Sequence, residues 1–196
     1  MKIDIATIKE LREETGMGVM DCKKALEEAG GDREKAKAFL KQRGAEIVAK
    51  KNLRTAKEGL IASYVHTGGK IGVLVEVNCE TDFVARNETF QNFAKNICLQ
   101  VAATNPTYLK VEDVPEPILA EQRKWWEEEV KDKSPSEREK FLAERLDNFY
   151  RENVLFQQPF IREPQKTVQE YLQEVAARIG EKIVIRRFVR LELGGE

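Results

Sequence analysis

The stretch that decides the fold is Asn-Cys-Glu-Thr-Asp-Phe-Val-Ala-Arg-Asn-Glu-Thr-Phe, residues 78–90. Before it, residues 71–77 place an apolar side chain at every second position, which is the period of a strand with one apolar face. After it, apolar residues recur every three or four positions up to Ala102, which is the period of an amphipathic helix. The stretch therefore predicts a strand, a short loop and a helix, with Asn87 as the helix N-cap.

The loop at this corner holds Thr81, Asp82 and Phe83, and two interpretations of it stay open. In the first, Asp82 accepts hydrogen bonds from backbone N–H groups of a turn, and Phe83 packs in the core. In the second, Phe83 is an exposed aromatic side chain beside a carboxylate and is directed at a partner protein, because aromatic anchors dominate the energetics of interfaces. The exposure of Phe83 distinguishes the two interpretations.

The composition is typical of a globular protein with a charged surface and no excess of either sign. Of 196 residues, 41% are hydrophobic and 34% are charged, and the formal net charge is -1. Because no large basic surface can neutralise a phosphate backbone, we expect no direct nucleic-acid binding. No apolar run reaches the roughly 18 residues of a membrane span, and the N-terminus lacks the apolar segment of a signal peptide. We therefore expect a cytoplasmic protein without a membrane partner.

The cysteines and the single histidine argue against an enzyme and against a metal site. Cys22, Cys79 and Cys98 are odd in number and lack CxxC spacing, which favours reduced thiols over a disulfide framework. His66 is the only histidine, so we expect neither a Ser/His/Asp triad nor a multi-histidine zinc site. Cys79 and Cys98 remain as candidate nucleophiles, although free cysteine commonly serves as a buried hydrophobe. We expect no enzymatic activity, no metal and no cofactor.

Residues 1–44 are predicted to form a module of three helices. A capping-box sequence at residues 7–10 would start the first helix, glycines would end the first two, and Asp32 would cap the third. The side chains expected to face inward are those of Ile8, Leu11, Cys22, Ala25, Leu26, Ala29, Ala36, Phe39 and Leu40. This pattern is that of a ubiquitin-associated-like bundle. Residues 17–20, Met-Gly-Val-Met, either pack in its core or form an adaptable apolar surface.

Residues 45–58 are predicted to be a charged helical linker, and residues 59–196 an α+β core domain. The elements expected in that core are strands over 60–66 and 71–77, a helix after 87, helices over 118–133, 135–153 and 168–180, an extended loop over 158–164, and a last strand over 182–193 with Ile183, Ile185, Val189, Leu191 and Leu193 on one face. Because strands and helices are segregated, the fold class is α+β: a three-helix bundle followed by a small antiparallel three-stranded sheet packed with helices.

Two segments resemble signature sequences of the bacterial elongation factor Ts family. Residues 11–26, Leu-Arg-Glu-Glu-Thr-Gly-Met-Gly-Val-Met-Asp-Cys-Lys-Lys-Ala-Leu, are similar to its N-terminal signature, and residues 76–86, Glu-Val-Asn-Cys-Glu-Thr-Asp-Phe-Val-Ala-Arg, to its second. Residues 158–160 and 164–167 resemble a third segment of the family's core. Longer members carry two related core subdomains, whereas this chain resembles a single composite copy without their inserted coiled coil and C-terminal helical module.

The resemblance implies a guanine-nucleotide exchange factor, not an enzyme, that acts on the GTPase elongation factor Tu during translation elongation. The corner would disturb the Mg²⁺ and phosphate site of the GTPase, with Phe83 as a wedge, while the N-terminal module grips the GTPase domain and His66 touches another domain. The residues thereby assigned to partner binding are Thr81, Asp82, Phe83 and Val84 at the corner, Leu11, Arg12, Val19 and Met20 on the N-terminal module, and His66 in the core.

A single subdomain with an open sheet edge also predicts a homodimer through the core sheet, at the strand over 182–193. Two other functions stay open alongside nucleotide exchange. One is a ubiquitin-associated-like adaptor, in which only residues 1–44 bind a partner. The other is RNA binding through the basic run at residues 50–54, although a single charge run is a weak signal.

Overall fold

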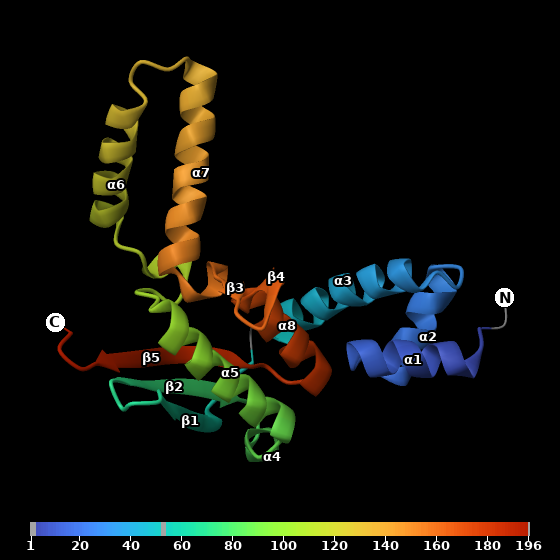
Figure 1. The fold of residues 1–196 in the computed structure, drawn as a ribbon. Helices are drawn as coiled ribbons and strands as arrows, with labels where there is room; N and C mark the ends of the chain where they lie inside the picture. The colour runs from blue at the N-terminus through green and yellow to red at the C-terminus, as the bar shows by residue number, and fades with distance from the viewer. Residues whose placement is uncertain (1–2, 52–53, 196) are drawn as a thin grey trace. The chain divides into compact units, whose positions relative to one another are not determined.

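The computed structural model describes residues 3–51 and 54–195, and of residues 45–51 the backbone alone (Figure 1). The elements are, in chain order, α1 (Ile5–Thr15), α2 (Val19–Glu28), α3 (Arg33–Lys51), β1 (Glu58–Val65), β2 (Ile71–Cys79), α4 (Asp82–Ala85), α5 (Glu88–Thr104), η1 (Val111–Asp113), α6 (Glu116–Glu129), α7 (Pro135–Asn153), η2 (Leu155–Gln157), β3 (Pro159–Phe160), β4 (Glu163–Thr167), α8 (Val168–Ile179) and β5 (Val184–Glu192). Three strands form an antiparallel sheet in the order β1-β2-β5, packed with helices, so the predicted α+β class is confirmed.

The chain divides into two compact units. The first contains Met1–Ala62, Glu76–Ala94 and Leu172–Arg186, and the second contains Ser63–Val75, Lys95–Tyr171 and Arg187–Glu196. Each of the three long strands and α5 contributes residues to both units. The domains predicted from the sequence, residues 1–44, 45–58 and 59–196, are consecutive segments, whereas each compact unit combines three separate segments. The predicted division therefore stays a prediction.

The helices of the N-terminal bundle begin and end at polar caps and glycines. Asp4, rather than the predicted box at residues 7–10, caps α1, and its Oδ1 accepts a hydrogen bond from the N–H of Ala6 at 3.3 Å. Gly16 ends α1 with φ +67°, a left-handed conformation that glycine adopts without a steric penalty. Asp32 caps α3 as predicted, because its Oδ1 accepts from the N–H groups of Glu34 and Lys35.

The core of this bundle confirms all but two of the predicted inward positions. The buried side chains are those of Ile8, Leu11, Met17, Cys22, Ala25, Leu26, Ala36 and Leu40, with Ala29 packed against them in part. The prediction for Phe39 was wrong, since this side chain is 40% exposed. The buried residues of α3, Ala36, Leu40 and Gly44, are spaced four positions apart, which is slightly more than one helical turn. The buried face of the helix therefore rotates away from position 39.

The hairpin of β1 and β2 supports the central part of the sheet. Val73, Val75 and Val77 are buried along one face of β2, as period two predicted. In β1, Gly59 has φ +142°, and a Cβ at this position would lie 2.1 Å from the carbonyl oxygen of Val77. The close approach of the two backbones therefore requires glycine at position 59.

Strand β5 does not keep the single apolar face that its sequence predicted. Ile183, directly before β5, and Ile185 are buried, but Val189, Leu191 and Leu193 are 50%, 69% and 77% exposed. Arg190 is nearly enclosed, and its Nε donates to the carbonyl oxygen of Ala102 in α5 at 3.4 Å. Two consecutive exposed arginines, at positions 186 and 187, interrupt the alternation, so the C-terminal half of β5 turns its apolar side chains outward.

The segment predicted as an extended loop at residues 158–164 instead carries a second, two-stranded sheet. In it Pro159 pairs with Thr167, and Phe160 pairs with Glu163. Two buried amides hold this segment against α5: Gln100 Nε2 donates to Gln158 Oε1 at 3.1 Å, and Gln100 Oε1 accepts from a backbone N–H of the segment at 2.9 Å. Short polar strands of this kind lack the alternation by which strands are recognised in sequences.

Of the remaining helices, α7 and α8 begin where the sequence predicts, whereas α6 spans Glu116–Glu129 instead of the predicted residues 118–133. A capping box at Ser134 and Glu137 opens α7, and another at Thr167 and Glu170 opens α8. Helices α6 and α7 form an antiparallel pair (Figure 1). Trp126 of α6 is buried in this pair and meets Phe149 of α7 edge to face.

Candidate functional site

The corner between β2 and α5 contains a one-turn helix that the sequence did not predict. Thr81 is the N-cap of α4, and its Oγ1 accepts a hydrogen bond from the N–H of Val84 at 3.4 Å. Arg86 ends α4, and Asn87 then caps α5 as predicted, because its Oδ1 accepts from the N–H of Thr89 at 2.8 Å. Of the corner residues predicted to contact the partner, Asp82, Phe83 and Val84 thus lie in a short helix, and Thr81 is its N-cap.

Phe83 points into solvent from this helix. Its side chain is 80% exposed, whereas Phe90 and Phe93 on the following helix are fully buried. The interpretation that placed Phe83 in the core is therefore wrong, and packing within this chain does not account for the residue. Leaving a phenylalanine in water forgoes roughly 1.5–3 kcal/mol of burial energy, which an interface can recover.

Asp82 lies beside Phe83 and is not the turn cap of the first interpretation, because Thr81 has that role. Its Oδ2 accepts a hydrogen bond from Nη2 of Arg86 at 2.9 Å, one turn further along, and the two side chains are 49% and 78% exposed. A solvent-exposed ion pair of this kind contributes only about 0–1 kcal/mol. Asp82 can therefore exchange Arg86 for a partner's donor at little cost in stability.

The residues predicted on the N-terminal module divide into buried and exposed groups. Val19 and Met20, in the first turn of α2, are 52% and 62% exposed, whereas Met17 is buried. Arg12 is exposed on α1, but Leu11 beside it is fully enclosed in the bundle core. Val19, Met20 and Arg12 can therefore reach a partner directly, while Leu11 supports them by packing.

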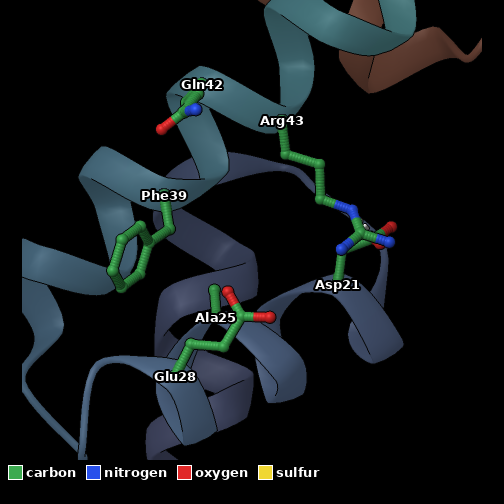
Figure 2. A pocket seen from close by; sticks show the side chains of 6 residues that line it. All are labelled: Asp21, Ala25, Glu28, Phe39, Gln42 and Arg43. Carbon is green, nitrogen blue, oxygen red and sulfur yellow. Dashed lines mark ion pairs between the residues drawn. The ribbon is translucent and has the colours of Figure 1, made fainter.

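A separate hollow of about 290 Å³ lies between α2 and α3 of the same module (Figure 2). At one side Arg43 Nε pairs with Asp21 Oδ1 at 3.1 Å, and the exposed ring of Phe39 lies at the other side (Figure 2). The lining residues are Asp21, Ala25, Glu28, Phe39, Gln42 and Arg43. None of the residues predicted to bind the partner lines this hollow.

His66 lies in the second unit, at the turn between β1 and β2. Its N–H donates to the carbonyl oxygen of Ile71 and its own carbonyl oxygen accepts from Gly69, each at 2.9 Å, as expected of a hairpin turn. The Nδ1 atom of the ring lies 2.9 Å from the hydroxyl oxygen of Tyr64. The imidazole is therefore an exposed ring oriented by one neighbour.

Comparison with known proteins shows which family carries these features. A family model described as Elongation factor TS matches residues 22–195. The chain belongs to the elongation factor Ts family. It is 50% identical over 194 residues to Elongation factor Ts of Thermoanaerobacter sp. (strain X514), covering 98% of this chain and 95% of that protein. The protein of the same name from Syntrophobacter fumaroxidans is 45% identical over 198 residues, covering 100% of this chain and 99% of the relative.

Membership of the elongation factor Ts family makes this chain a protein-synthesis elongation factor. Cys22, Cys79 and Cys98 are all buried. Burial raises the pKa of each thiol, to about 11 for Cys79 and for Cys98. Since the thiolate is the nucleophile, a raised pKa disfavours Cys79 and Cys98 as the nucleophiles considered from the sequence.

The sequence also raised two questions about binding partners: whether a helix spans a membrane, and whether the basic run at residues 50–54 binds RNA. Among the described residues, no helix combines the length and the apolar character that a membrane crossing needs. The basic run at residues 50–54 lies almost wholly outside the residues whose side chains are described. Arg54, its last member, is described, and its Nη1 pairs with Oε2 of Glu80 at 3.2 Å.

Sequence reasoning missed two residues that hydrogen-bond at the corner, Glu80 and Glu181. Glu80 lies inside the signature segment but was not assigned a role, and Glu181 contacts Glu80 and Thr81 from about a hundred positions further along the chain. No periodicity or spacing relates residues so far apart. Only the fold brings them together.

Proposed function

We propose that this chain is a guanine-nucleotide exchange factor for elongation factor Tu, acting without covalent chemistry in the cytoplasm. The observation that carries the proposal is the exposure of Phe83, at 80%, on a capped helical turn. This turn belongs to the segment at residues 76–86 that resembles a family signature, within the region that the family model matches. An exposed aromatic on an ordered support is the arrangement expected of an interface anchor.

The mechanism is one of differential binding. An exchange factor accelerates release by binding the nucleotide-free GTPase more tightly than the nucleotide-bound form, and nucleotide then weakens the factor's binding by the same ratio. Phe83 inserts as a wedge beside the Mg²⁺ site of the GTPase. Asp82, released from Arg86, competes for polar groups that support the metal and phosphates.

Two further surfaces contribute affinity in this proposal. Val19 and Met20 present a small apolar patch in which methionine adapts its shape to the partner, and Arg12 adds a positive charge on the neighbouring helix. His66 contacts a second domain of the GTPase. The adaptor alternative differs in a measurable way, because it needs only the N-terminal patch and assigns nothing to Phe83.

We also propose that the core sheet mediates a homodimer. On the second unit, exposed apolar side chains occur on all three strands, and β5 is an edge of the sheet. They are Val65, Leu74, Val189 and Leu191, with Leu193 directly after β5, and each is between 50% and 77% exposed. A two-fold axis would cover this surface with an identical copy. One subunit would then present Phe83 while the other presents His66.

Two measurements test the proposed function. Release of a fluorescent GDP analogue from elongation factor Tu should accelerate when this chain is present below the GTPase concentration, because each molecule acts repeatedly. Binding without acceleration would refute exchange and favour the adaptor. Sedimentation should show a dimer at micromolar concentration, and a stable monomer there would refute the dimer.

A further inference from the structure

Glu181 supports the corner that carries Phe83. It follows α8 and precedes β5, and both of its carboxylate oxygens accept hydrogen bonds from the residues directly before α4. Oε2 accepts from the backbone N–H groups of Glu80 and Thr81, each at 3.1 Å, and Oε1 accepts from the hydroxyl of Thr81 at 2.7 Å. One side chain thus satisfies three donors at the point where β2 has ended and α4 begins.

Glu80 in turn accepts a hydrogen bond from the loop that contains Glu181. Glu80 Oε1 accepts from the backbone N–H of Lys182 at 2.6 Å, and its Oε2 accepts from Nη1 of Arg54 at 3.2 Å. Lys182 Nζ also donates to the carbonyl oxygen of Arg54 at 2.8 Å. All these residues belong to the first unit. Hydrogen bonds that involve a charged group are shorter and stronger than neutral ones, so two adjacent loops are joined tightly.

The helix that bears Phe83 cannot hold itself in place. It has four residues, none of which is buried, and isolated helices of one turn do not persist in water. Apart from Glu181, Thr81 is held by two bonds from the helix itself, from the N–H of Val84 to its Oγ1 at 3.4 Å and from the N–H of Ala85 to its carbonyl oxygen at 3.3 Å. That carbonyl oxygen also accepts a hydrogen bond from Cys79 Sγ at 3.1 Å. The direction of Phe83 therefore depends on how Thr81 is anchored.

We propose that Glu181 is a positioning residue for nucleotide exchange, which orients the Thr81–Phe83 corner so that Phe83 is presented before the partner arrives. The inference rests on the proposed function, because it assigns Glu181 a role through the wedge. An anchor that is already ordered loses less conformational entropy on binding than one that must be ordered in the complex. Glu181 itself makes no contact with the GTPase in this scheme.

The test measures GDP release from elongation factor Tu with full-length variants, separating the maximal rate from the half-saturating concentration. Glu181→Ala should lower the maximal rate by about tenfold, less than the roughly thirtyfold expected for loss of the aromatic anchor itself. Glu181→Gln should recover most of that loss, because its amide oxygen still accepts from both backbone N–H groups and its NH₂ can donate to the Thr81 hydroxyl. Glu170→Ala is the matched control: it removes a capping carboxylate at the other end of α8 and should leave the maximal rate unchanged.

A double variant separates positioning from general stability. In a Phe83→Ala background, Glu181→Ala should lower the rate by less than about twofold further, since residues that act through one another are not additive. Full additivity, or a normal rate for Glu181→Ala alone, would overturn the positioning role. If Glu181→Ala does not fold, Thr81→Val keeps the side-chain shape but removes the 2.7 Å bond to Glu181 together with the 3.4 Å cap bond from the N–H of Val84, and it should slow release in the same direction.

The failures of the two proposals are distinguishable. A Phe83→Ala variant that releases GDP at the normal rate refutes the wedge, and the role of Glu181 falls with it. Slow release with Phe83→Ala but normal release with Glu181→Ala refutes only the role of Glu181.

Discussion

Phe83 and Phe90 lie seven residues apart and should respond to alanine substitution in opposite ways. Phe83 is 80% exposed on α4, and Phe90 is fully buried on α5. Because Phe83 makes little contact within the chain, Phe83→Ala should change the free energy of unfolding by less than about 0.5 kcal/mol. Phe90→Ala should lower it by about 3–5 kcal/mol, since the substitution leaves a cavity in the core.

The two variants should affect the rate of GDP release in the opposite order from stability. Truncating an interface anchor costs about 2 kcal/mol or more, so Phe83→Ala should slow stimulated GDP release roughly thirtyfold. Phe90→Ala, at temperatures where it stays folded, should keep most of the stimulated rate. Trp125→Ala is the control for an exposed aromatic elsewhere, since Trp125 is 64% exposed on α6, and it should alter neither quantity.

Denaturant unfolding and release of a fluorescent GDP analogue supply the two measurements on the same preparations. If Phe83→Ala unfolds at markedly lower denaturant concentration, the side chain contributes to the core and is not a free interface anchor. If Phe83→Ala stimulates GDP release as well as the unaltered chain does, Phe83 has no part in nucleotide exchange.

Three further predictions follow from the fold. Gly59→Ala should lower the free energy of unfolding by more than about 1 kcal/mol, because its Cβ would lie 2.1 Å from a carbonyl oxygen of β2. Calorimetry checks this, with Gly72→Ala as the control, since a Cβ there would meet no atom within 4 Å. The free energy of unfolding should fall as pH rises from about 9 to about 11, because the unfolded chain then releases thiol protons that buried Cys79 and Cys98 retain. Cys98→Ala should make the free energy of unfolding less dependent on pH in this range. Leu191→Arg, on the exposed face of β5, should yield monomers in sedimentation while leaving the circular dichroism spectrum unchanged, and a persistent dimer would exclude this face.

Local sequence signals predicted most of the elements and many of their ends. The glycines at 16 and 18, the caps at Asp32 and Asn87, and the capping box at Ser134 act on neighbouring backbone groups, so they can be read without knowing the fold. The periodicity of α5 and β2 likewise identified their buried faces. Errors arose where a local pattern was compatible with two outcomes, as at Asp4, which caps α1 one turn before the predicted box.

The sequence by itself determined the α+β class, the strand-corner-helix arrangement around residues 78–90 and the family resemblance, since each of these depends on short-range order. Only the tertiary structure decided that Phe83 is exposed while Phe39 leaves the inward stripe of its helix, and that β5 turns its apolar side chains outward beyond Arg187. It also decided that Glu181 accepts hydrogen bonds from residues about a hundred positions earlier. Side-chain exposure and long-range hydrogen bonds depend on which segments the folded chain brings together, so the spacing of residues along the sequence does not predict them.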